Sequence, residues 1–243
     1  MEATFFSSRE VSNLYQTEAL LGNYALAYAF GFARSPYHND GHIRYPEELG
    51  ALNDAGVYVT PGTFITAPQF ILRQFNAQTD AYWSAFGAGF IAARPPLGWS
   101  EKEGQHWYPV DESGQRQSRF RAINRPQHGR IRMLAINNQA RCYVLSERKL
   151  PIPHYIRLGK FMSKARVEVQ PIEHQVVEAT QRQVEFLLNP ADLPATCQLS
   201  LFDLISVPPA PLVKNAWIEG DFYQLAHGHW LPQGMRFNTG ANP

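Results

Sequence analysis

The sequence is poor in cysteine and lacks the motifs of common metal sites. Its 243 residues include only two cysteines, Cys142 and Cys197, and both lie in apolar, strand-like surroundings. We expect them to be reduced core residues of a cytosolic protein, and nothing in the sequence supports a disulfide between them. No Cys-x-x-Cys pair occurs. The pair His227-x-His229 has no third ligand nearby in sequence, so a surface turn is favoured over a metal site.

Long apolar runs and phosphate-binding motifs are missing as well. No basic region followed by an apolar run opens the chain, and its longest apolar segment, Tyr24 to Ala33, is too short to span a bilayer. These absences predict a soluble, cytoplasmic protein with no membrane partner. There is no phosphate loop, nucleophile elbow or aligned pair of acids, so we expect no cofactor and no metal.

Acidic residues are almost absent from one stretch, Gln115 to Arg166. It contains thirteen lysines and arginines and a single acid, Glu147, so its local net charge is +12 while the whole chain carries +1. Cations that neutralise phosphates, interleaved with rings on which bases can stack, are typical of a single-stranded nucleic-acid site. The alternative is a solvated basic face whose aromatic residues belong to the core. The surface of an ordinary soluble protein usually intersperses positive and negative side chains. The near absence of acids here therefore favours the nucleic-acid interpretation.

The first part of the chain predicts one long helix. Ser7-Ser8-Arg9-Glu10 has the pattern of a capping box, and apolar residues at near-helical spacing continue to about Phe32. From Ser35 to Pro68, prolines and glycines predict turns between short strands.

Strands are predicted through most of the remaining chain. Ala165, Val167 and Val169 alternate with polar residues as in a half-buried strand. Trp217 to Glu219 and Phe222 to Leu225 predict a closing hairpin. We therefore expect an α+β fold with an antiparallel sheet, built as one domain of residues 1–243 with a loop- and hairpin-rich insertion at about 69–118.

The most specific local pattern runs from Tyr155 to Arg166. Gly159 permits a positive φ or a close backbone approach, and it has cations on both sides. A basic, glycine-centred turn that leads into a strand suits a grip on phosphates. The residues predicted to bind RNA are Tyr155, Arg157, Gly159, Lys160, Phe161, Ser163, Lys164 and Arg166. Those predicted to contact an RNA or DNA backbone are Arg116, Arg119, Arg121, Arg125, Arg130 and Arg132.

An enzymatic alternative uses the same region. His154, Tyr155 and Lys160 suit a metal-independent endoribonuclease, in which a base takes the ribose 2′-hydroxyl proton and the lysine stabilises the charged phosphorane. These residue types also suffice for binding alone, so we expect no catalysis. A third interpretation is a protein-interaction module that docks through residues 24–32 and 208–212.

Several segments, in order along the chain, carry a resemblance to a known family. Phe5-Phe6-Ser7-Ser8-Arg9-Glu10, the run Asn23 to Ala29, the run Gly56 to Pro61, the run Tyr155 to Val169 and Gly234-Met235-Arg236-Phe237 are similar to segments of the Csc-one family of the Cas-five class. These are RAMP-type subunits of type I-D CRISPR Cascade complexes. The resemblance is weakest across residues 69–114.

The resemblance implies a ferredoxin-like core of the RNA-recognition-motif type with an inserted hairpin. It also implies a non-catalytic, RNA-binding subunit of an antiviral ribonucleoprotein, which caps the 5′ handle of crRNA. Its expected partners are the backbone and large subunits of the complex and target DNA near the protospacer-adjacent motif.

Overall fold

The chain forms two compact units in the computed structural model. The described residues are 1–11, 14–34, 44–77, 82–84, 90–93, 99–103, 106–111, 113–115 and 127–240. Unit 1 consists of Met1–Glu10, Gln16–Ile71 and Arg132–Pro243, and unit 2 consists of Val11–Tyr15 and Leu72–Ile131. The organisation as a single domain with one insertion stays a prediction.

The described residues contain two short α-helices, and the predicted long N-terminal helix is wrong. Residues expected at its start form strands β1 (Arg9–Val11) and β2 (Leu14–Gln16) instead, and only α1 (Asn23–Ala29) is helical. The predicted capping box, Ser7 to Glu10, precedes no helix, because Arg9 and Glu10 lie in β1 and the Ser8 backbone N–H donates to the Gln16 carbonyl at 2.9 Å. The apolar residues at near-helical spacing therefore belong to two kinds of structure. Short strands come first and a short helix follows, and together they give the apolar pattern of one long helix.

Helix α2 (Tyr45–Asp54) lies where only turns and short strands were expected. Pro46 sits in the first turn of this helix, where its missing N–H has no intrahelical partner to lose. Glu47 and Glu48 follow in the same turn and interact favourably with the helix dipole. Pro46, one of the prolines taken to indicate turns between Ser35 and Pro68, therefore belongs to the start of a helix.

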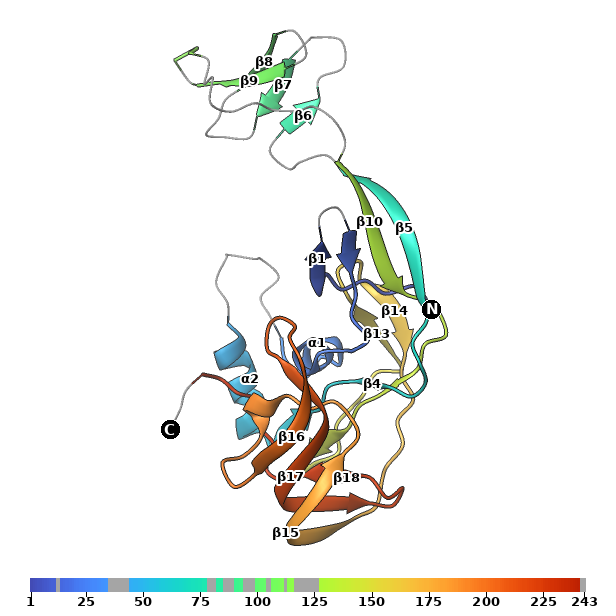
Figure 1. Cartoon of the computed structure of the whole chain (residues 1–243). Helices are drawn as coiled ribbons and strands as arrows, with labels where there is room; N and C mark the ends of the chain where they lie inside the picture. The colour runs from blue at the N-terminus through green and yellow to red at the C-terminus, as the bar shows by residue number, and fades with distance from the viewer. Residues whose placement is uncertain are drawn as a thin grey trace. The chain divides into compact units, whose positions relative to one another are not determined.

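Unit 1 contains several small antiparallel sheets (Figure 1). The largest joins β15 (His174–Val184), β17 (Leu212–Leu225) and β16 (Gln198–Ile205) in that order, with β18 (Trp230–Pro232) also paired to β17. Three pairs complete the set: β13 (Tyr155–Leu158) with β14 (Ser163–Arg166), β12 (Val144–Ser146) with β3 (Val57–Val59), and β11 (Ala140–Arg141) with β4 (Thr63–Phe64).

Strands β5 (Phe70–Ala77) and β10 (Gln127–Leu134) run through the boundary between the two units and form a sheet in the order β1-β2-β10-β5. Unit 2 also contains a four-stranded antiparallel meander in sequence order. Its strands are β6 (Tyr82–Ser84), β7 (Phe90–Ala93), β8 (Trp99–Glu103) and β9 (His106–Val110).

The predicted closing hairpin at residues 217–225 is wrong, because β17 continues through both halves of it. Gly220 allows this with an extended backbone, and a Cβ added there would lie 2.8 Å from the sulfur of Cys197. The glycine therefore marks a close approach between neighbouring chain segments. A chain reversal does occur nearby, between β17 and β18.

The core of unit 1 is apolar and draws on helix α1 and several sheets. Leu26 and Ala27 of α1 are buried together with Val59 of β3, Ile156 of β13 and Phe222 of β17. Helix α1 packs on both β3 and β13. The inner face of the β13–β14 pair is thus fixed by the core, while its outer face remains free for other contacts.

A buried carboxylate ties together parts of unit 1 that are distant in sequence. Asp192, in the 3-10 helix η1 (Pro190–Asp192), is 2% exposed. Its oxygens accept hydrogen bonds from Asn23 Nδ2 at 2.6 Å, the Tyr58 hydroxyl at 2.9 Å and the Asn238 backbone N–H at 2.8 Å. Burial raises the pKa of Asp192 to about 6, although these hydrogen bonds oppose the shift.

The described structure is therefore mostly β-sheet with two short helices, which is compatible with the predicted α+β class. The ferredoxin-like arrangement of the core stays a prediction. None of the described helices has the length and apolar character needed to cross a bilayer.

Candidate nucleic-acid interface

Strands β13 and β14 place four of the eight residues predicted to bind RNA on one exposed face. The pairing sets Tyr155 opposite Arg166 and Arg157 opposite Lys164. All four side chains are exposed, while the alternating residues Ile156 and Leu158 are buried in the core. Because neighbours in a strand point to opposite faces, the apolar half of the pattern fixes the direction of the charged half.

The turn between these strands is held by the N-terminal segment. Gly159 has a φ of +73°, and a Cβ added there would lie 2.3 Å from the carbonyl oxygen of Phe5. The same oxygen accepts a hydrogen bond from the Lys160 backbone N–H at 2.8 Å. The close approach that glycine permits is therefore made to Phe5 of this chain. Gly159 shapes the turn, and its direct contact with RNA stays a prediction.

Ser163 also serves an internal contact. Its side chain is 3% exposed, and its hydroxyl donates a hydrogen bond to the carbonyl of Ala3 at 2.8 Å. This bond and the Phe5 contacts join β14 and the turn to residues 3–5. Contact between the Ser163 hydroxyl and a phosphate stays a prediction, and the geometry described here does not favour it.

The cations on the exposed face are only partly balanced by acids. Arg157 Nη1 lies 3.6 Å from Glu2 Oε2, and Arg166 Nη2 lies 2.5 Å from Glu168 Oε1, with all four side chains more than half exposed. Such exposed pairs contribute little to stability and are screened by salt. Lys160 makes no ion pair with any described residue. The face therefore keeps an excess of positive charge that a phosphate chain can use.

Arg157 and Lys164 are like charges placed directly across an antiparallel pair. Such an arrangement is destabilising unless something compensates for it. Glu2 partly does so, because its carboxylate lies near Arg157 and accepts a hydrogen bond from the Lys164 backbone N–H at 2.7 Å. An anionic ligand would complete the compensation.

Two aromatic residues on the hairpin differ in how much ring surface they offer. The ammonium group of Lys164 lies 4.2 Å from the centroid of the Tyr155 ring, so one face of that ring already has a cation–π contact. Phe161, in the turn, stacks on buried Phe5 with ring centroids 5.3 Å apart and is still 58% exposed. Phe161 is the better supported platform for a stacked base.

The arginines predicted to contact a backbone are mostly outside the described residues: Arg116, Arg119, Arg121 and Arg125. Arg130, in unit 2, is exposed. Arg132, in unit 1, is half-buried, and its guanidinium carbon lies 3.7 Å from the centroid of the Phe70 ring. Arg132 therefore packs on its neighbour strand, and its contact with nucleic acid stays a prediction.

The three residues of the enzymatic alternative lie before, at the start of and after strand β13. Tyr155 begins β13, whereas Lys160 lies in the turn after its last residue, Leu158. At about 3.3 Å per residue, the strand alone separates them by roughly 10 Å. His154 is exposed and precedes the strand. The absence of catalysis stays a prediction.

His227 and His229 follow strand β17 in the turn before β18, as expected for a surface turn. Within the described ranges, no three His, Cys, Asp or Glu side chains are grouped so that they could hold a metal ion. The sequence analysis missed Glu2 and Phe5, which complete the charged face and the turn. Their role was hidden because they lie more than 150 residues from the hairpin.

The comparison with protein families identifies the chain. Residues 1–240 match the model of a family described as "Type I-D CRISPR-associated protein Cas5/Csc1". The chain therefore belongs to this family, as its sequence segments indicated, and membership implies a subunit of a type I-D Cascade complex. No curated protein matched the chain.

Proposed function

We propose that this chain is the non-catalytic subunit of a type I-D Cascade complex that caps the 5′ handle of crRNA. We further propose that the subunit helps to form the region that reads the protospacer-adjacent motif in target DNA, between the backbone and large subunits. Membership of the family supports the assignment of the chain to a type I-D Cascade complex. The observation that carries the RNA role is the exposed face of the β13–β14 hairpin, where Arg157, Lys164 and Arg166 lie around Tyr155.

The face suits a single strand better than a duplex. A base can stack on Phe161, at the turn, while the cations on the strands hold the phosphates. Backbone contacts of this kind fix the position of a strand and carry little sequence information. A subunit that caps a fixed RNA end must above all hold that end in one position, and contacts to the RNA backbone can do this.

The salt dependence of RNA binding tests the proposal. We expect the Lys160→Glu and Lys164→Glu double variant to bind a 5′-handle RNA more weakly. For a single strand, each lost phosphate contact should reduce the slope of log K against log salt by roughly 0.7. Lys149→Glu is a matched control, because Lys149 is exposed in the same basic stretch but lies outside the hairpin. A slope unchanged in the double variant, or reduced equally in the control, would contradict the assignment.

The cellular version of this test uses the tagged protein purified from its own host. Sequencing of the co-purified RNA should give short species that share one repeat-derived 5′ end, together with larger subunits of the complex. The double variant should retain the subunits and lose RNA occupancy. Random RNA fragments in the wild-type sample would refute handle capping.

The absence of catalysis is also part of the proposal, supported by the separation of Tyr155 from Lys160. Repeat RNA incubated with the protein and EDTA should remain intact. A cut product that disappears in the Tyr155→Phe variant would favour the metal-independent ribonuclease instead.

A further inference from the structure

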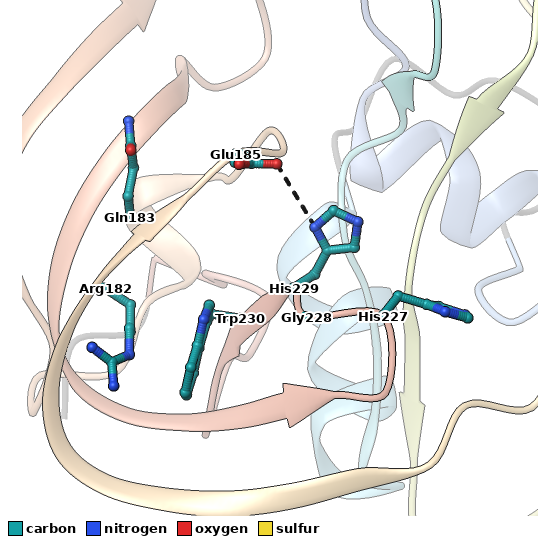
Figure 2. A pocket seen from close by; sticks show the side chains of 7 residues that line it. All are labelled: Arg182, Gln183, Glu185, His227, Gly228, His229 and Trp230. Carbon is teal, nitrogen blue, oxygen red and sulfur yellow. Dashed lines mark ion pairs between the residues drawn. The ribbon is translucent and has the colours of Figure 1, made fainter.

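A second candidate site lies in unit 1, where the end of β15 meets the turn between β17 and β18. Its volume is about 370 Å³. Figure 2 shows its lining side chains, which come from the two sides of this junction. The lining residues are Arg182, Gln183, Glu185, His227, Gly228, His229 and Trp230.

The guanidinium group of Arg182 has few hydrogen-bond acceptors among the described residues. Its guanidinium carbon lies 4.4 Å from the centroid of the Trp230 ring, which holds the side chain in place by a cation–π contact. Its Nε is buried and has no hydrogen-bond partner among the described residues. Its Nη1 makes only a long bond of 3.4 Å, to the Gln181 carbonyl. Because Nε is closed off from solvent, a ligand in the pocket can reach only the Nη groups, and an oxygen acceptor there would improve on the long bond to the Gln181 carbonyl.

The opposite side of the pocket contains a short chain of charged and polar groups. His229 Nδ1 lies 3.8 Å from Glu185 Oε2, as the dashed line in Figure 2 marks, and its Nε2 lies 3.4 Å from Arg141 Nη1. Glu185 is therefore engaged by the imidazole. The lining itself carries one arginine and one glutamate, and Arg141, which contacts His229 without lining the pocket, adds one more positive charge beside it.

The ligand must supply oxygen acceptors and also occupy more space than an inorganic anion. Guanidinium groups bind phosphate oxygens in a planar, two-point geometry. A volume of about 370 Å³ is within the range of about 300–1,000 Å³ found for small-molecule sites. Trp230 and the guanidinium stacked on it form a flat surface of the kind on which bases stack.

We propose that this pocket binds one nucleotide, with phosphate oxygens at the Nη groups of Arg182 and the base against the Arg182–Trp230 stack. The site is separate from the hairpin face, since it is built from the end of β15, the turn after β17 and the start of β18. It does not depend on the hairpin's proposed role in handle binding. The nucleotide is either free or a single residue of a strand, and the same chemistry serves both.

Calorimetric titration of the full chain with AMP and UMP tests the proposal. Arg182→Lys keeps the positive charge but loses the planar fork, so we expect about a tenfold or greater loss of affinity, as for a lost charge-assisted hydrogen bond. Trp230→Phe should weaken binding less, because it keeps a smaller ring. Arg148→Lys is the matched control, since Arg148 is exposed and does not line the pocket.

Several outcomes would overturn the proposal. One is the absence of binding by either nucleotide to a folded wild-type protein. Another is an Arg182→Lys variant that melts at the wild-type temperature and binds as tightly as the wild type. Inorganic phosphate that binds as tightly as AMP would also refute it, because the base would then contribute nothing.

A single-stranded RNA oligomer distinguishes the two sources of the nucleotide. If the oligomer displaces AMP from the Lys160→Glu and Lys164→Glu double variant, the pocket accepts a nucleotide within a strand. If AMP remains bound, the ligand is a free nucleotide. Both results support nucleotide binding in the pocket. Either result can be obtained whether or not the hairpin binds the crRNA handle, so the failure of one proposal can be distinguished from the failure of the other.

Discussion

The exposed face of the β13–β14 hairpin and the buried centre around Asp192 use charge in opposite ways. On the hairpin, Arg157 and Arg166 form exposed ion pairs with flexible acids, so their loss should cost unit 1 little stability. At the centre, one carboxylate is surrounded by donors from Asn23, Tyr58 and Asn238 and is almost fully buried. The first arrangement leaves charge available to a ligand, and the second commits charge to the fold.

The strongest test of this comparison removes the buried carboxylate. Asp192→Ala leaves the Asn23 amide, the Tyr58 hydroxyl and the Asn238 N–H without their acceptor. We expect a loss of about 3–5 kcal/mol in the free energy of unfolding, as when a buried charged network loses one partner. Urea denaturation would measure it. Arg157→Ala, on the hairpin face, should lose less than about 1 kcal/mol, and equal losses at both positions would refute the comparison.

The second test shows where the hairpin itself depends on buried structure. Gly159→Ala forces a Cβ against the Phe5 carbonyl and keeps a positive φ. Steric overpacking and the backbone conformation together predict a loss of about 2–4 kcal/mol. Gly31→Ala has a similar φ of +76° but open space around its Cβ, so it should lose only about 1–2 kcal/mol. Thermal melts of both variants should therefore differ, and matching melts would mean that Phe5 moves freely.

The third and smallest effect is a pH dependence of stability. Burial raises the pKa of Asp192 from 3.8 to about 6, so the folded state holds this proton more tightly than the unfolded chain. The stabilisation is complete below pH 4 and is lost as the pH rises through 6. We expect the wild type to lose about 1–3 kcal/mol relative to Asp192→Asn between pH 4 and pH 7. Parallel stability curves for the two proteins would contradict this origin.

The sequence predicted the turn at Gly159 better than it predicted the strands and helices around it. The basic, glycine-centred turn leading into a strand is confirmed, since Gly159 has a positive φ and β14 begins at Ser163. The half-buried strand predicted from Ala165 to Val169 is wrong in its bounds, because β14 ends at Arg166 and Val169 is exposed. The partner strand β13 was not predicted.

The helix predicted to extend to Phe32 failed because apolar spacing cannot separate two short strands and a short helix from one long helix. Similarly, Gly220 was taken as a turn residue, although its role is to let Cys197 pack closely.

The buried centre could not be predicted, because its partners are brought together only by the complete fold. Asp192 and Asn23 are 169 positions apart, and Tyr58 comes from a third segment. Nothing local distinguishes this aspartate from a surface one. The pocket residues Arg182 and Trp230 were missed for the same reason, since a cation and a ring 48 positions apart carry no mutual signal in the sequence.

The contacts of residues 2–5 with the hairpin have a practical consequence for experiments on this protein. Glu2 pairs with Arg157, the Ala3 carbonyl accepts from Ser163, and the Phe5 carbonyl accepts from Lys160. Residues 2–5 thus stabilise the hairpin surface that is proposed to bind RNA. A purification tag placed next to them alters that surface as directly as a substitution within it. Binding measurements are therefore best made with the tag at the other end of the chain.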